Sequence, residues 1–222
     1  MNNFYFFEPH TLIIDTISSN EWVATMMQLM KLAGNNLYEH SIDVALLTAS
    51  MALSGNQELL SDIPIRSLIL GALLHDIGYI GMPCIPSRLM SEQEYTSIEK
   101  MAFDIHLTAG LEQVRLHTND YIVLDIVSKH HEYLDGSGVP FGLIGNAIPL
   151  HVRIVALSNF LVNYSSSSIL LSTGKPQCLI NVLQSALTDK NIYQKYDIAI
   201  LKAFLIDMKN HFQNLSPLLA GV

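Results

Sequence analysis

Histidines recur on the apolar faces of the predicted helices, and this pattern constrains the fold more than any other feature of the chain. His106 follows Ala102 by four residues and Phe103 by three, which is the spacing of neighbours on one helix face. Buried imidazoles need polar partners, so histidines placed this way on several helices are expected to converge. Five histidines on four predicted helices have this placement: His40, His75, His106, His130 and His131.

The apolar spacing is mainly helical, and it predicts an all-α, multi-helix bundle around these histidines. Hydrophobic residues make up 50% of the chain, which is ample for a core. Residues 1–20 mix aromatic and β-branched side chains without a long helical period. We interpret them as an N-terminal arm that packs on the body or on a partner, and residues 21–222 as one helical domain.

Local start and stop signals set the expected bounds of the helices. Asn20 is a candidate N-cap, and Gly34 a stop signal, for the first helix of the domain. Ser91 and Glu94 have the spacing of a capping box. Helices are expected over about 21–33, 36–53, 62–77, 91–104, 105–116, 120–132, 149–164, 177–188 and 193–213, with a Gly/Pro-rich loop at 135–149 and a Ser-rich connection at 165–168.

The charge pattern limits the partners. With 12 Lys and Arg against 20 Asp and Glu, the net charge is −8, and no basic run is present to follow a DNA or RNA polymer. Only 14% of the residues are charged, against about a quarter in a typical domain, which favours a homo-oligomer or a protein partner that covers apolar surface.

No membrane association is expected from the sequence. The N-terminus lacks the basic and apolar regions of a signal peptide. The most apolar stretch, 63–74, is interrupted by Arg66 and is shorter than the ~20 residues that a membrane span needs. These features predict a cytoplasmic protein.

Asp76 adds a carboxylate to the group of histidines, because it follows His75 directly. Neutral imidazoles are common metal ligands. One carboxylate shared among several imidazoles is a sound way to hold two divalent ions a few ångströms apart. The residues therefore predict a metal centre inside the bundle.

Several motifs resemble those of the HD-GYP family. His75-Asp76-Ile77-Gly78 followed by Gly81-Met82-Pro83 resembles "HDxGKxGxP", and the stretch from His130-His131-Glu132 through Ile148-Pro149 resembles "HHExxDGxGYPxGLxGxxIP". His40, His106 with Gly110, and Arg153-Ile154 match further positions in order. The resemblance covers about residues 36–165 and implies an all-helical fold of the HD phosphohydrolase superfamily.

The resemblance also implies ligands and a reaction. Typical members hydrolyse cyclic di-GMP with two or three ions, often iron or manganese, which polarise the phosphodiester and activate water. By this likeness two ions would be held, with Asp76 shared between them. The implied metal ligands are His40, His75, Asp76 and Asn159 for one ion, and Asp76, His106, His130 and His131 for the other.

The resemblance assigns further residues to catalysis and substrate binding. Tyr79 and Arg153 would have catalytic roles beside Asp76, and Arg153 would steady either the site or a guanine. The Gly-rich loop would border the substrate groove. Its implied substrate-binding residues are Gly136, Ser137, Gly138 and Pro140.

Three positions depart from the family pattern. Tyr79 replaces the lysine after "HDxG", Val139 replaces the tyrosine of "GYP", and Asn159 replaces an aspartate. A phenol or an amide can form a hydrogen bond but cannot neutralise charge. Asn36 stands where some members place a glutamate, so a third ion is not expected.

Two functions follow from the complete set of histidines and the lost charges. The first is a metal-dependent phosphodiesterase that converts cyclic di-GMP to pGpG or GMP, with reduced activity, since losing one electrostatic stabiliser lowers a rate by on the order of 10²–10³. The second is a catalytically weak or inactive signalling module that binds a cyclic dinucleotide or a protein partner. Turnover of cyclic di-GMP separates the two.

Overall fold

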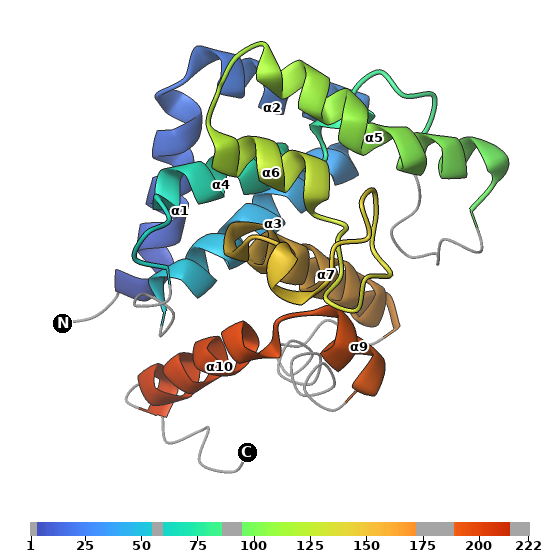
Figure 1. Cartoon of the computed structure of the whole chain (residues 1–222). Coiled ribbons are helices and arrows are strands. Elements are labelled where there is room, and N and C mark those ends of the chain that lie inside the picture. The colour runs from blue at the N-terminus through green and yellow to red at the C-terminus, as the bar shows by residue number, and fades with distance from the viewer. Residues whose placement is uncertain (1–3, 55–59, 86–94, 172–188, 214–222) are drawn as a thin grey trace.

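The protein is a bundle of α-helices, as expected from the sequence. The computed structural model describes residues 4–54, 60–85, 95–171 and 189–213 (Figure 1). Within these ranges no strand forms, and the one isolated β-bridge pairs Asp135 with Ile144. The elements are α1 (Phe4–Ser18), α2 (Glu21–Ala33), α3 (Asn35–Leu53), α4 (Ile65–Leu74), η1 (Ile77–Tyr79), α5 (Ser97–Arg115), α6 (Tyr121–Lys129), η3 (Gly145–Ala147), α7 (Leu150–Leu171), α9 (Lys190–Lys195) and α10 (Ile198–Gln213).

The N-terminal segment is helical, although its sequence lacks a long helical period. The helix α1 covers most of residues 1–20 and packs against α2, α3 and α4. Ile13, on this helix, is 4% exposed. Tertiary packing overrides weak local preference here. The segment therefore lies on the body, while its separation from the domain as an arm stays a prediction.

The helix signals near Asn20 are confirmed. The Asn20 side chain accepts hydrogen bonds from the N–H groups of Trp22 and Val23, and α2 ends at Gly34 as expected. The helix α3 ends at Leu53, also as expected.

The capping box that opens α5 is formed by Thr96 and Glu99, whereas Ser91 and Glu94 lie outside the described residues. The break expected near residue 105 is absent. One helix runs through Asp104-Ile105, where no glycine or proline interrupts it.

The helix α4 ends earlier than expected, and this early end shapes the centre of the protein. It stops at Leu74, so His75 is its C-cap and Asp76 leads into η1. The backbone of α5 crosses η1 so closely that a Cβ on Gly78 would lie 1.9 Å from the carbonyl oxygen of His106. The glycine of the "HDxG" motif is therefore required by close backbone packing.

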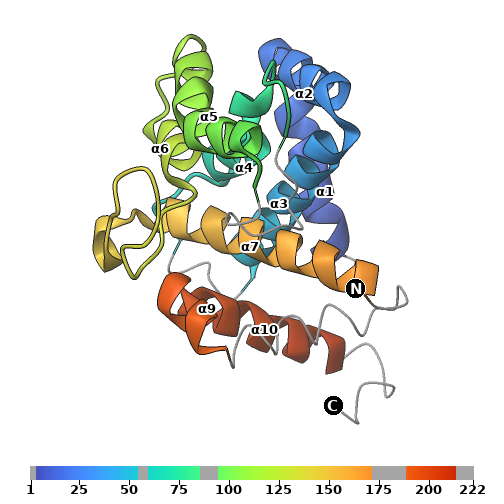
Figure 2. The ribbon, with the colours of Figure 1, turned by 90° about the vertical axis from the view of Figure 1, so that its right-hand side faces the viewer.

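The C-terminal helices differ from expectation in two places. The helix α7 continues through residues 165–168, which were expected to form a connection, and the expected helix over 193–213 is divided into α9 and α10 at Tyr196-Asp197. The helix expected over 177–188 lies outside the described residues. In Figure 2, α7 lies between α10 and the helices α1 to α6.

The hydrophobic core joins α3, α4, α6 and α7, which pack on one another. Its fully buried side chains include Leu68, Ile69, Leu73, Ile126 and Ile154. The helix α6 packs on both α4 and α5. His75 and His130 are the C-caps of α4 and α6, whereas His40 lies within α3 and His106 within α5.

Candidate metal centre

The carboxylate of Asp76 is surrounded by imidazoles. Its Oδ2 lies 3.3 Å from Nε2 of His75 and 3.8 Å from Nε2 of His40. Its Oδ1 lies 3.4 Å from Nε2 of His130 and 3.7 Å from Nε2 of His106. The two oxygens of one carboxylate thus face two different pairs of histidines, as the sequence predicted for a shared ligand.

Backbone carbonyl groups fix the orientation of three of these rings. Nδ1 of His75 lies 2.8 Å from the carbonyl oxygen of Ala72. Nδ1 of His106 lies 2.6 Å from that of Phe103, and Nδ1 of His130 lies 3.1 Å from that of Ile126. A carbonyl oxygen can only accept, so each Nδ1 carries the hydrogen and each Nε2 presents a lone pair. This is the arrangement found in histidine ligands of metals.

The donor set fits a divalent cation. The lone pairs of the Nε2 atoms face the Asp76 carboxylate, which has no hydrogen to donate. The buried Nε2 of His75 forms no hydrogen bond in the described part of the chain. His106 and His130 bring their Nε2 atoms within 3.5 Å of each other. A cation would satisfy these converging acceptors, and nitrogen and oxygen ligands suit iron, manganese or zinc.

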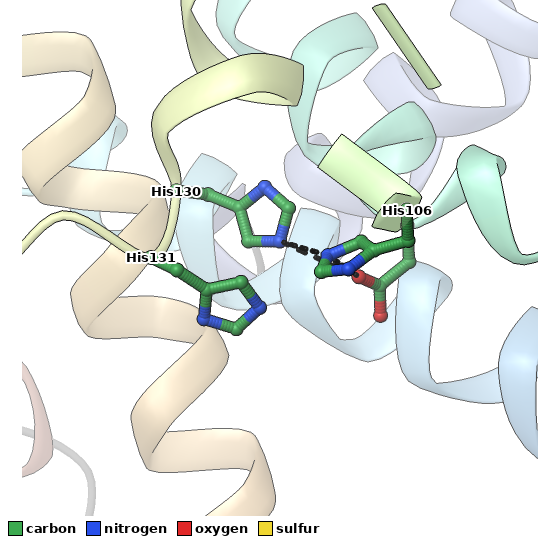
Figure 3. A group of neighbouring side chains, drawn as sticks. His106, His130 and His131 are labelled. Atoms are coloured by element: carbon green, nitrogen blue, oxygen red, sulfur yellow. Dashed lines mark hydrogen bonds and ion pairs between the residues drawn. The ribbon is translucent and has the colours of Figure 1, made fainter. Parts of the chain in front are cut away.

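Two groups of ligand atoms form around Asp76. Each group has its ligand atoms within 4.8 Å of one another. One contains His40, His75 and Asp76, and the other contains Asp76, His106, His130 and His131. Figure 3 shows the rings of His130 and His131, at the end of α6, turned toward His106 of α5. All five predicted histidines are brought together.

Burial keeps the second group of imidazoles neutral. It lowers the pKa of His106 to about 4, although the nearby Asp76 carboxylate acts in the opposite direction. Burial also lowers the pKa of His130 and His131, and the neighbouring imidazoles add to this effect. At neutral pH these rings are therefore in the form that binds metal.

Tyr79 and Arg153, expected to have catalytic roles, contact other groups. Tyr79 is 5% exposed, and its ring stacks on that of His106, with centroids 4.3 Å apart and 7° between the planes. Nη1 of Arg153 donates to Oδ2 of Asp197 at 2.7 Å. Tyr79 thus packs on an imidazole of the candidate centre, and Arg153 joins α7 to the start of α10; their catalytic roles stay predictions.

The chain's sequence matches the model of the HD domain over residues 37–160, which is more than half of its 222 residues. The matched range contains every histidine of the centre. The chain belongs to the HD domain family.

Relatives of this HD domain bear out its resemblance to HD-GYP proteins. It is 38% identical over 102 residues to the cyclic di-GMP phosphodiesterase response regulator RpfG of Xanthomonas campestris pv. campestris (strain 8004), covering 45% of this chain and 26% of the relative. It is 34% identical over 128 residues to the 3'3'-cGAMP-specific phosphodiesterase 1 of Vibrio cholerae serotype O1 (strain ATCC 39315 / El Tor Inaba N16961), covering 55% and 27%. The chain therefore spans about a quarter of the length of these relatives.

A solved structure supports the fold. Bd1817, described as a HDG"Y"P protein from Bdellovibrio bacteriovorus, superposes on this HD domain with a TM-score of 0.56 and 15% identity, over 90% of this chain and 68% of that one. The expected all-α HD fold is confirmed.

None of the helices in the described ranges combines the length and apolar character that a membrane crossing requires.

Asn159 is buried on α7, with 5% of its surface exposed. Its amide oxygen accepts a hydrogen bond from Nδ2 of Asn163 at 3.0 Å. An amide oxygen has two lone pairs, so this bond leaves one for an ion. The role of Asn159 as a ligand stays a prediction.

The Gly/Pro-rich loop follows the histidine pair of this HD domain. Oδ1 of Asp135 accepts hydrogen bonds from the N–H and the hydroxyl of Ser137, which lower the pKa of Asp135. Gly136 has a φ of +81°, in the left-handed region that glycine adopts without strain. Gly138 lies against the backbone of His131. The substrate contacts expected of Gly136, Ser137, Gly138 and Pro140 stay predictions.

Glu132 was assigned no role from the sequence, yet its carboxylate is buried and bound to this loop. The signal that could have found it is its position, since a glutamate directly after the histidine pair and before a glycine-rich loop has backbone N–H groups within reach.

Proposed function

We propose that this HD domain hydrolyses a phosphodiester bond of a cyclic dinucleotide, cyclic di-GMP, with two divalent ions of iron or manganese. The observation that carries the proposal is the single carboxylate of Asp76 between two groups of histidine Nε2 atoms. The names of several relatives, which include cyclic di-GMP phosphodiesterases, support the choice of substrate. The product, pGpG or GMP, is set by how many bonds are cut.

The residues divide the work between holding ions and fixing rings. His40, His75 and Asp76 would hold one ion, with Asn159 as a further ligand, and Asp76, His106, His130 and His131 would hold the other. Bound divalent ions polarise a phosphodiester and lower the pKa of water toward neutrality. The carbonyl oxygens of Ala72, Phe103 and Ile126 keep the rings in the ligand orientation without rearrangement.

Burial strengthens this arrangement. His75, His106 and His130 are each 1% exposed or less, so their electrostatic interactions are screened little by water. The net charge of −8 repels an anionic substrate, and ions at Asp76 would supply the local positive charge that a phosphate needs. A cytoplasmic location belongs to this proposal, as the sequence led us to expect.

The test is turnover by protein loaded with iron or manganese without oxygen. Both cyclic di-GMP and 3'3'-cGAMP are offered, because relatives are named for each. We expect hydrolysis of cyclic di-GMP, and loss of at least 10²-fold in His75→Ala and Asp76→Ala. His10→Ala, at an exposed position on α1, is the matched control and should retain full activity.

The second candidate is a signalling module that binds the nucleotide without turnover. It is favoured by the buried Tyr79, which puts a neutral ring where the family pattern has a lysine. Tight binding of cyclic di-GMP with no product from metal-loaded protein would support this candidate and refute the enzyme. A homo-oligomer or protein partner belongs to either proposal.

A further inference from the structure

The carboxylate of Glu132 is buried at the base of the Gly/Pro-rich loop, outside both groups of metal ligands. It is 2% exposed. Its Oε1 accepts the backbone N–H of Phe141 at 2.6 Å, and its Oε2 accepts that of Leu143 at 2.7 Å. Bonds from N–H groups to a carboxylate are short and strong, so one side chain fastens two points of the loop.

The same loop is seated on the backbone of the metal ligand His131. The N–H of Val139 donates to the His131 carbonyl oxygen at 3.0 Å. A Cβ on Gly138 would lie 2.4 Å from that oxygen and 2.4 Å from the backbone nitrogen of Tyr133. Residues 138–143 are therefore held on residues 131–133 both by the Glu132 carboxylate and by these backbone contacts.

His131 depends on this support more than the other ligands of its group. Its ring lies against the rings of Phe103, His106 and His130, with centroids 4.3 to 5.2 Å apart. In the described part of the chain, His131 has no bond from Nδ1 to a carbonyl oxygen of the kind that fixes His106 and His130. Its orientation therefore depends on these ring contacts and on its backbone, and the loop holds that backbone.

We propose that Glu132 is a positioning residue for the metal centre: its carboxylate holds the loop of residues 138–143 on the backbone of His131 and so keeps that ring directed at the ion. The inference rests on the proposed function only in taking His131 as a ligand. Groups that orient metal ligands contribute about 10- to 100-fold to metal affinity, so the effect is measurable without turnover.

The test uses the full chain with Glu132→Gln. The glutamine keeps the shape but turns an NH₂ group toward one of two N–H donors, so one bond is lost. We expect faster hydrogen exchange at the amides of Phe141 and Leu143, and a fall of about 10-fold or more in Mn²⁺ affinity. The matched control is Glu99→Gln, since Oε2 of Glu99 accepts the Thr96 N–H at 2.9 Å in the capping box of α5; it should change neither.

A double-mutant cycle with His131→Ala shows whether Glu132 acts through this ring. We expect Glu132→Gln to weaken Mn²⁺ binding in the natural chain and to have no effect once His131 is alanine. Additive losses of affinity would overturn the inference, because they would mean that Glu132 acts elsewhere. An unchanged affinity in Glu132→Gln would overturn it as well.

Two further measurements test the inference if Glu132→Gln does not fold. Gly138→Ala pushes the loop from His131 while leaving Glu132 intact, and it should lower Mn²⁺ affinity in the same way; an unchanged affinity refutes the inference. In the natural chain, the amides of Phe141 and Leu143 should be protected from exchange, and unprotected amides refute it. Natural protein that binds Mn²⁺ without hydrolysing a cyclic dinucleotide would refute the proposed function alone, whereas natural protein without Mn²⁺ binding would refute both.

Discussion

Replacing Gly78 by alanine tests the close crossing of η1 and α5 on which the metal centre depends. The new Cβ would lie 1.9 Å from the carbonyl oxygen of His106, 2.8 Å from its carbonyl carbon and 2.7 Å from the nitrogen of Gly110. All three atoms belong to the backbone, so no side chain can rotate away. An ordinary contact begins near 3.4 Å, which requires the two segments to separate by about 1.5 Å.

This separation should be costly in both stability and metal binding. Overpacking of a core typically costs about 1–3 kcal/mol, and we expect the upper end for Gly78→Ala because the backbone must move. At about 2–4 °C per kcal/mol for a chain of this size, the melting temperature should fall by about 6–12 °C. The movement also carries Asp76 away from His106, so Mn²⁺ affinity should fall by more than tenfold.

Thermal unfolding with a metal chelator, and Mn²⁺ titration of the folded protein, measure the two effects of Gly78→Ala. Gly81→Ala is the matched control, since a Cβ there meets nothing within 4 Å and only the φ of +82° opposes it. That strain is worth about 1–2 kcal/mol and should leave metal affinity unchanged. A Gly78→Ala protein as stable as Gly81→Ala, with natural Mn²⁺ affinity, would mean that the crossing of η1 and α5 does not require glycine at position 78.

Three further predictions follow from the site and its surroundings. Tyr79→Phe keeps the ring on His106 and should leave Mn²⁺ affinity within about threefold of the natural value. Tyr79→Ala removes the ring and should lower the free energy of unfolding by about 3–5 kcal/mol. Equal unfolding curves for the two variants would contradict the stacking role. Asn159→Asp adds a charge where the family pattern has one and should raise Mn²⁺ affinity in competition assays; an unchanged affinity would remove Asn159 from the ligands. Burial lowers the pKa of His151 below 6.5, although the hydrogen bond from Nε2 of His151 to Oδ2 of Asp125 acts in the opposite direction. The folded protein therefore binds fewer protons than the unfolded chain, and stability should fall as the pH drops below about 6.5. His151→Gln should reduce this slope of unfolding free energy, measured with a chelator present, by up to about 1.4 kcal/mol per pH unit, and an identical slope would be contrary to it.

Local signals predicted the elements whose ends depend on nearby residues. The bounds of α2 follow from Asn20 and Gly34, which act within one turn of the helix ends. The helix α1 and the uninterrupted α5 were not predicted, because packing against other helices decided them. The early end of α4 was missed for the same reason, since α5 presses on Gly78 from a distant part of the chain.

In the site, too, some features were predicted from the sequence and others depend on distant segments. Periodicity and motif order predicted that the five histidines and Asp76 would meet, and they do. The partners of Tyr79 and Arg153 could not be predicted, because each comes from a distant segment; Asp197, for example, lies 44 residues beyond Arg153. The loop contacts of Glu132 depend on the backbone path of residues 138–143, which composition alone does not specify.

We propose that imidazoles on both sides of the Asp76 carboxylate hold two ions. Crystals of the protein grown with Mn²⁺, with anomalous scattering recorded at the manganese edge, would locate each ion. We expect two peaks, one beside His40, His75 and Asp76 and one beside Asp76, His106, His130 and His131. Anomalous density on one side of Asp76 only, or none among these residues, would contradict this proposal.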